Sequence, residues 1–160
     1  MESLLPIAAR VGALLKERKE TLCISESSAG GLISAALLAV PGASAYFLGG
    51  AVVYTREART ELLGLTREEL AGVPPSTEAY ALVLARGARA RLSTTWCLAE
   101  IGATGPTGNR YGYNAGHACF AVAGPREASV TLETGNGDRI GNMRRFGMGA
   151  LELLEQTLRG

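Results

Sequence analysis

The serine- and glycine-rich run SESSAGG (25–31) is the first place in the chain whose residue types could carry out chemistry. An apolar run beginning at Thr21 predicts a buried strand that ends at Ser25, and a helical pattern begins at Leu32. Hydroxyls on such a strand-to-helix turn suit a nucleophile, and free N–H groups there would favour an anion or a developing oxyanion. Serine and glycine are also common as plain helix caps, so this run alone leaves both roles open.

A second glycine-rich segment, GATGPTGN (102–109), also follows an apolar run, WCLAEIGA (96–103). Sheets that mix helices and strands bind ligands at the carboxyl ends of their strands. The two turns are therefore expected to share one site, although a bare hairpin loop explains the second equally well. Neither segment matches the phosphate-binding loop or the dinucleotide fingerprint, because the required helix and lysine or acidic residue are missing.

Histidine and cysteine offer little catalytic or metal-binding potential. His117 is the only histidine and opens an apolar strand, where a structural, partly buried role is the commoner outcome. The three cysteines, Cys23, Cys97 and Cys119, lie in apolar runs without C-x-x-C spacing. We expect no metal site, no disulfide framework and a reducing compartment.

The elements that must position these residues alternate between strand and helix periodicity. Strands are expected at 21–25, 49–55, 96–103, 117–124 and 128–132, the last by a hairpin. Helices are expected from Pro6 to about Glu20, at 32–40, at 55–64, at 66–72, from Ser76–Glu78 to about Arg91, and from Asp138 onwards. This order predicts a single domain over residues 1–160 with an α/β fold, a three-layer α/β/α sandwich around a mixed sheet.

Composition narrows the class of protein. With 47% hydrophobic and 19% charged residues in 160, the chain can bury a core and is neither disordered nor membrane-embedded. A net charge of +1 does not favour a nucleic-acid partner, and the N-terminus lacks the features of a signal peptide, so a cytoplasmic location is expected. Only Lys16 and Lys19 could supply an amine for chemistry.

Four segments, in order along the chain, resemble those of the CinA C-terminal family, the nicotinamide-nucleotide amidases. ESSAGG (26–31) resembles the family's E-S-C-T-G-G, and VPGASAYFLGGAVVYTREARTELLG (40–64) resembles its next motif. GATGPTG (102–108) and GDR (137–139) resemble the remaining two. The resemblance implies an α/β/α domain, found alone or behind a molybdopterin-binding-like domain. It also implies hydrolysis of the carboxamide of nicotinamide mononucleotide to nicotinic acid mononucleotide and ammonia, with a serine nucleophile and a lysine base.

Carried over by motif, the resemblance makes Ser27 the nucleophile and puts Tyr54 and Arg59 at the other catalytic positions. The residues expected to bind substrate are Glu26, Ser28, Gly30, Gly31, Arg56, Thr104, Gly105, Pro106, Thr107, Gly108, Asn109 and Arg139. No cofactor and no metal is implied. The expected partner is a small-molecule nucleotide, with no nucleic acid and no membrane, and a homo-oligomer is expected because family members commonly self-associate.

Three departures from the family pattern cluster at this site. The family lysine is Arg59 here, the family asparagine is Arg56, and the family threonine is Ala29. Arginine keeps its proton, so Arg59 cannot act as the base for Ser27. Arg56 and Arg59 would suit a phosphate or carboxylate, or would be solvated surface residues.

Three functions remain open from the sequence. The first is an amidohydrolase that lacks its usual base, and the second is a non-catalytic nucleotide-binding relative. The third is a hydrolase with a different base, either His117 or a water held by Glu26. The longer loop NRYGYNAGH (109–117) carries two tyrosines that would stack on a ring.

Overall fold

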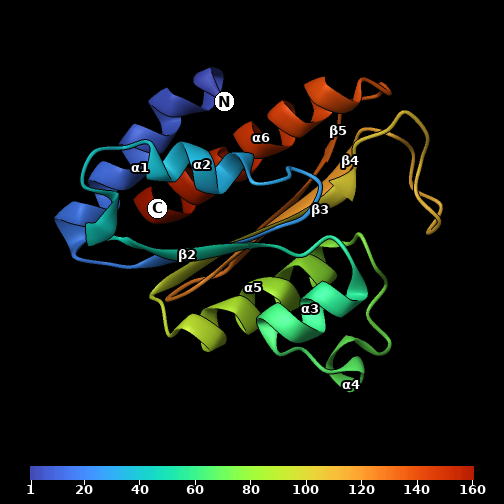
Figure 1. Cartoon of the computed structure of the whole chain (residues 1–160), viewed down its shortest axis with the longest axis horizontal. Helices are drawn as coiled ribbons and strands as arrows, with labels where there is room; N and C mark the ends of the chain where they lie inside the picture. The colour runs from blue at the N-terminus through green and yellow to red at the C-terminus, as the bar shows by residue number, and fades with distance from the viewer.

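A five-stranded mixed sheet forms the centre of the computed structural model, which describes every residue from 1 to 160 (Figure 1). The strands are β1 (Leu22–Glu26), β2 (Phe47–Val52), β3 (Trp96–Ala103), β4 (His117–Ala123) and β5 (Ala128–Glu133). Their order across the sheet is β2-β1-β3-β4-β5. β1 is parallel to β2 and β3, whereas β4 is antiparallel to both of its neighbours, β3 and β5.

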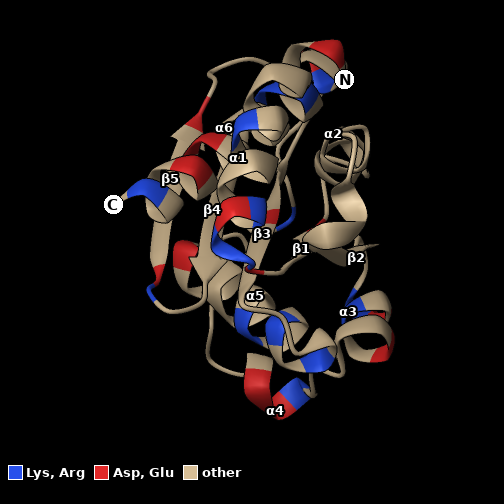
Figure 2. Cartoon of the chain, turned by 90° about the vertical axis from the view of Figure 1, so that its left-hand side faces the viewer, with Lys and Arg blue, Asp and Glu red and all other residues tan.

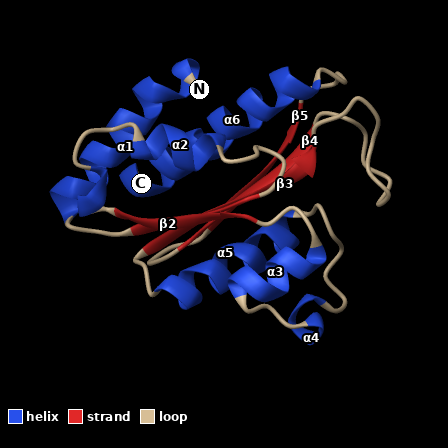
Figure 3. Cartoon of the chain, in the orientation of Figure 1, coloured by secondary structure: helices blue, strands red, loops and turns tan.

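Helices cover both faces of this sheet (Figure 3). One layer holds α1 (Leu5–Arg18), α2 (Leu32–Leu38) and α6 (Arg139–Arg159), together with the short 3-10 turns η1 (Glu2–Leu4) and η2 (Ala43–Ala45). The other layer holds α3 (Arg56–Leu63), α4 (Arg67–Leu70) and α5 (Glu78–Leu92). The predicted α/β/α sandwich around a mixed sheet is confirmed.

Alternation of side chains along the central strands produces two separate cores. Trp96 and Leu98 on β3 pack with α1 and α6, whereas Cys97 and Ala99 pack with α5. All five residues of β1 and all seven of β4 are buried, which is why most residues of these strands are apolar, apart from the polar ones at the edge of the sheet that carries the site. The outer strands β2 and β5 are only partly covered.

Most element ends shift by one or two residues from the sequence-based prediction, and at two places a helix cap explains the difference. β2 is Phe47–Val52 and not 49–55, because Thr55 has left the strand and accepts a hydrogen bond from the N–H of Ala58 as the cap of α3. α5 is capped by Thr77, while Ser76 adopts a φ of 61° just before it. In both places the helix begins at a threonine whose hydroxyl accepts a backbone hydrogen bond, and this cap sets the boundary.

The carboxyl ends of the parallel strands β2, β1 and β3 meet at one edge of the sheet, and β4 begins at the same edge, where Ala103 pairs with His117. This edge therefore carries the Ser27 turn, the start of α3 and the loop 104–116. Acidic and basic residues are spread over both helical layers (Figure 2). No helix combines the length and the apolar character needed to cross a membrane.

Candidate active site

Ser27 lies in the turn between β1 and α2, and the side chain of Glu100 on β3 holds this turn. One oxygen of Glu100 accepts hydrogen bonds from the backbone N–H groups of Ser27 and Ala29, each 2.9 Å long. The other oxygen accepts a hydrogen bond from the hydroxyl of Ser28. Ser27 is only 5% exposed and Glu100 is fully buried. The turn is thus fixed to the neighbouring strand.

Glu26, the last residue of β1, caps the start of α2 with its buried carboxylate. One oxygen accepts from the N–H groups of Gly31 at 2.9 Å and Ile33 at 3.1 Å. The other accepts from the N–H of Ser34 at 3.0 Å and from its hydroxyl at 2.6 Å. A helix start normally attracts an anion through its unpaired N–H groups and its dipole, and here the protein's own carboxylate fills that position.

The two carboxylates occupy the N–H groups that the sequence suggested for a substrate. Glu100 takes those of Ser27 and Ala29, and Glu26 takes three more at the start of α2. The expectation of a ready anion site at these N–H groups is therefore wrong. Burial raises the pKa of Glu100, and the nearby charge of Glu26 adds to this, although the hydrogen bonds from the turn oppose the shift. The Ser27 hydroxyl itself makes no hydrogen bond within the protein.

The first turns of α6 bring the GATGPTG loop against the Ser27 turn. Arg139 donates a 2.7 Å hydrogen bond to the carbonyl of Gly105. One turn later, the Cε atom of Met143 lies 2.8 Å from where a Cβ would stand on Gly30, whose φ is 68°. Any side chain at Gly30 would therefore meet Met143 and also strain the backbone. Both glycine-rich turns therefore contact the first two turns of α6, at the edge of the sheet where β1 and β3 end.

Asn142 on α6 anchors the same loop from inside the protein. Its Nδ2 donates to the carbonyls of Thr104 and Asn136, each at 2.9 Å, and its Oδ1 accepts from the hydroxyl of Thr134 at 2.6 Å. Asn142 is 1% exposed. Beyond this anchor, Pro106, Thr107 and Gly108 are exposed, and the half-buried Asn109 donates to the hydroxyl of Ser76 at 3.1 Å.

Arg59 on α3 is buried and has no acidic partner. It is 5% exposed, and its Nη1 donates a 3.0 Å hydrogen bond to the hydroxyl of Tyr80 on α5. Its Nε is buried without any hydrogen bond, and so is the hydroxyl of Ser25 on β1. Arg56 and Tyr54 are instead exposed. The two arginines therefore have different environments: only Arg59 is a buried cation, and its guanidinium lies over the Tyr80 ring at 5.4 Å from the ring centroid.

No lysine amine is available near Ser27. Lys19 ends α1 and Lys16 donates to the carbonyl of Pro41, so both lie before the amino end of β1. β1 has five residues, which at about 3.3 Å per residue places Ser27 roughly 15 Å or more farther along the sheet. These two amines cannot substitute for the missing family lysine.

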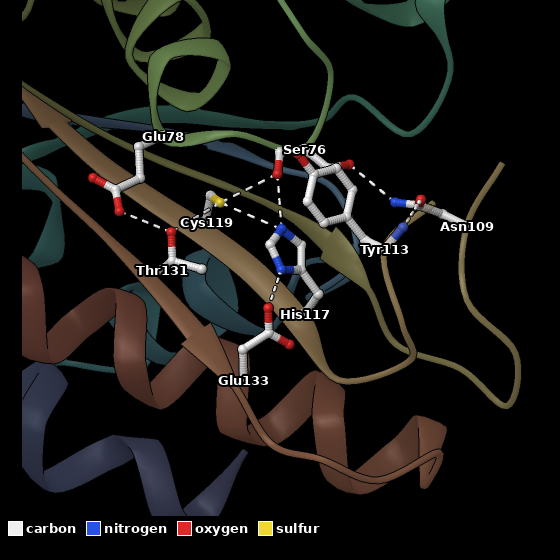
Figure 4. A network of polar contacts seen from close by, with 8 residues as sticks. All are labelled: Ser76, Glu78, Asn109, Tyr113, His117, Cys119, Thr131 and Glu133. Carbon is white, nitrogen blue, oxygen red and sulfur yellow. Dashed lines mark hydrogen bonds and ion pairs between the residues drawn. The ribbon is translucent and has the colours of Figure 1, made fainter. Parts of the chain in front are cut away.

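His117 is buried and belongs to a separate polar network on the α5 side of the sheet, which extends to the exposed Glu133 (Figure 4). Its Nε2 donates a 2.8 Å hydrogen bond to the carbonyl of Ser76, because a carbonyl can only accept, and its Nδ1 contacts the carboxylate of Glu133. The ring of Tyr113 stacks on the imidazole at a centroid distance of 4.1 Å. Cys119 lies 3.6 Å from Nε2, but its thiol donates to the same Ser76 carbonyl.

These contacts leave His117 no free nitrogen, and burial raises the pKa of the Cys119 thiol. The cysteine, histidine and glutamate superficially match a catalytic triad, yet the Ser76 carbonyl occupies the nitrogen that would accept the thiol proton. The predicted structural role of His117 is confirmed. Neither His117 nor Glu26, whose oxygens are saturated, can serve as the base considered from the sequence.

Two site residues escaped the sequence analysis, namely Glu100 and Asn142. Glu100 stands in an otherwise apolar run, and a charged residue at a position predicted to be buried is a signal that could have been followed. Asn142 falls on the apolar face of a helix and gives the same type of signal. Their partners lie far away in the chain, so their roles required the tertiary structure.

Comparison with known proteins places this geometry in a family. Residues 4–158 match the model described as CinA C-terminal domain. A CinA-like protein from Cyanothece sp. (strain PCC 7425 / ATCC 29141) is 40% identical over 119 residues, which are 74% of this chain and 28% of that protein. A CinA-like protein from Parasynechococcus marenigrum (strain WH8102) is 37% identical over 148 residues, 92% of this chain and 34% of that protein. The chain thus spans about a third of the length of these curated relatives.

Solved structures agree with the same assignment. A CinA superfamily protein from Klebsiella pneumoniae 700603 superposes with a TM-score of 0.88 at 26% identity and covers 96% of each chain. The competence/damage inducible protein CihA from Agrobacterium tumefaciens has a TM-score of 0.88 at 26% identity, covering 98% of this chain and 96% of its own. With four motifs, the fold and the family model in agreement, this chain belongs to the CinA C-terminal domain family.

Proposed function

We propose that this protein is an amidohydrolase of the nicotinamide-nucleotide amidase type, which hydrolyses the carboxamide of nicotinamide mononucleotide or a related compound with Ser27 as nucleophile. The observation that carries the proposal is the Ser27 turn. Its backbone is held by Glu100, its hydroxyl makes no internal hydrogen bond, and the start of α6 contacts both this turn and the GATGPTG loop. A hydroxyl that the fold positions without using it is available to a substrate.

In the proposed reaction, Ser27 Oγ adds to the carboxamide carbon and its proton passes to the leaving nitrogen or to water. The C–N bond then breaks, ammonia leaves, and water hydrolyses the resulting ester to release a carboxylate and restore Ser27. Arg59 keeps its proton throughout. Its role in the proposal is to favour negative charge, either on the substrate or on the oxyanion.

Ammonia release from nicotinamide mononucleotide by wild type and Ser27→Ala tests the proposal, and a Ser3→Ala variant outside the site serves as the matched control. We expect measurable turnover that Ser27→Ala abolishes and Ser3→Ala preserves. Because a general base contributes about 100- to 10,000-fold, Arg59→Lys should raise the rate steeply if lysine can restore it. Equal release by wild type and Ser27→Ala would reject Ser27 as nucleophile.

A second candidate function is pyridine-nucleotide binding without turnover, and the environment of Arg59 favours it. A buried guanidinium that lacks an acidic partner is costly, and an anionic ligand would compensate its charge. Calorimetric titration with nicotinamide mononucleotide separates the candidates. Binding without ammonia release supports the second function, and no binding of any pyridine nucleotide removes it.

A further inference from the structure

Glu100 has an environment that ordinary packing does not explain. It is fully buried on β3, directly after Ala99, which pairs with Ser25 of β1. No lysine, arginine or histidine pairs with it. Its partners belong to three consecutive residues of one turn, the N–H groups of Ser27 and Ala29 and the hydroxyl of Ser28. A buried carboxylate without a cation is costly, so an apolar side chain would be the simpler solution at this position.

Glu26 shows by contrast what is particular to Glu100. Both are buried carboxylates on the same side of the sheet, and the charge of Glu26 is the one that acts on Glu100. The side chain of Glu26 binds the start of α2 and makes no hydrogen bond to Ser27. Glu100 binds Ser27 and its two successors, and no other side chain accepts from the N–H of Ser27. Glu26 therefore stabilises a helix, whereas Glu100 fixes the backbone that carries the Ser27 hydroxyl.

We propose that Glu100 is a positioning residue for Ser27, acting through its hydrogen bonds to the Ser27–Ala29 backbone and to Ser28. This inference rests on the proposed function of Ser27. The carboxylate sets the orientation of the turn from the neighbouring strand, so that Ser27 faces the substrate side in one conformation. What matters is a hydrogen-bonding atom at each of the two positions, an acceptor for the two N–H groups and a partner for the Ser28 hydroxyl, and a side-chain amide can supply both.

The test measures the rate at which a fluorophosphonate modifies Ser27, with the site confirmed by peptide mass spectrometry. Glu100→Gln keeps an oxygen for the two N–H groups and turns an NH2 group toward Ser28, whereas Glu100→Leu leaves both N–H groups without an acceptor. We expect Gln to stay near the wild-type rate and Leu to fall by roughly a hundredfold, as a displaced reacting group does. Ser28→Ala, which removes one contact of three, should fall between them. Glu127→Gln, an exposed carboxylate far from the turn, serves as the control.

Amide hydrogen exchange of Ser27 and Ala29 gives an independent readout that needs no reactive serine. Their protection should persist in Glu100→Gln, fall by roughly a hundredfold in Glu100→Leu and fall to a lesser extent in Ser28→Ala, because the opening of the turn becomes easier with each contact that is lost. If the wild-type serine is not modified, the proposed function fails, while exchange still decides the role of Glu100. Unchanged protection in Leu and Ser28→Ala would overturn the inference. Modification of Ser27 that is as slow in Glu100→Gln as in Glu100→Leu would overturn it too, since the charge of Glu100 and not its hydrogen bonding would then matter.

If Glu100→Leu does not fold, the comparison of Glu100→Gln with Ser28→Ala remains. Both variants retain the acceptor for the N–H groups of Ser27 and Ala29. Glu100→Gln changes the group that faces the Ser28 hydroxyl, whereas Ser28→Ala removes that hydroxyl. A slower reaction in Ser28→Ala with a normal rate in Glu100→Gln supports positioning by hydrogen bonds. The reverse order contradicts it.

Discussion

At one edge of the sheet, the buried polar groups are fully hydrogen-bonded on one face and partly unpaired on the other. On the side of α2 and α6, Glu26 and Glu100 are buried, and every oxygen is hydrogen-bonded. On the side of α3 and α5, Arg59 and Ser25 each leave a buried polar atom without a partner. Satisfied buried charges usually stabilise one conformation, whereas unsatisfied ones cost free energy unless a ligand compensates them. The contrast separates a side of the site whose buried carboxylates are hydrogen-bonded from a side that keeps unpaired buried polar atoms.

The largest expected effect comes from removing Glu26. Glu26→Ala leaves three N–H groups and the hydroxyl of Ser34 without their acceptor, so we expect a loss of about 3–5 kcal/mol in the free energy of unfolding. Urea unfolding measures it, and Glu61→Ala on the exposed side of α3 should match wild type. A loss below about 1 kcal/mol would mean that the start of α2 does not depend on this carboxylate.

Replacing Arg59 tests the face of the sheet that α3 and α5 cover, where buried polar atoms are unpaired. Arg59→Met should leave the free energy of unfolding unchanged or raise it by about 1 kcal/mol, because the change removes a buried charge that has no acidic partner. The dissociation constant for nicotinamide mononucleotide should rise at least tenfold, about 1.4 kcal/mol. Calorimetry and urea unfolding check both, with exposed Arg67→Met as the control. If Arg59→Met unfolds easily and binds normally, Arg59 is part of the core and the two faces do not differ as described.

For Glu100 we expect a smaller effect, namely a dependence of the free energy of unfolding on pH. Burial raises its pKa above the ordinary 4.5, so the folded protein holds this proton more tightly than the unfolded chain does. The resulting stability is fully present below the unfolded pKa and is lost as the pH rises through the folded pKa. Urea unfolding at about pH 4 to 8 should therefore show wild type losing stability with rising pH relative to Glu100→Gln. Parallel curves would mean that Glu100 stays ionised without penalty.

The smallest effect is expected at the exposed end of α6, far from the site. Arg10 holds the pKa of Glu155 down, with help from Arg159, to about 2. This contribution is present above the unfolded pKa and is lost as the pH falls toward 2. Arg10→Ala should cause only a slight loss of stability near neutral pH, and high salt should reduce it, because solvent screens an exposed pair. A large loss would show that buried charges are not special in this protein.

Much of the fold could be predicted from local patterns. The run 96–103 is β3 as predicted, Gly64 ends α3 with a φ of 70°, and Asp138 caps α6. These features depend on residues near one another in the chain, where periodicity and capping preferences act directly. β2 was displaced because its ends are set by pairing with β1 and by the Thr55 cap, and no local pattern distinguishes Val52 from Val53.

The candidate site was predicted less completely. The motifs identified the Ser27 turn and the GATGPTG loop, and the structure brings both to α6. The expected anion-binding N–H groups were occupied, because Glu100 reaches them from 73 residues away for Ser27 and 71 for Ala29. Long-range hydrogen bonds of this kind leave no periodic signal in the sequence.

The sequence by itself determined the family, the order of helices and strands, and the absence of a lysine at the position of Arg59, since these depend on residue identity and local spacing. Only the tertiary structure decided that Arg56 is exposed while Arg59 is buried, and that two carboxylates satisfy the turn. The physical reason is that burial and hydrogen bonding are set by which segments pack together. An arginine is a solvated surface charge at position 56 and a buried cation with one unpaired nitrogen at position 59.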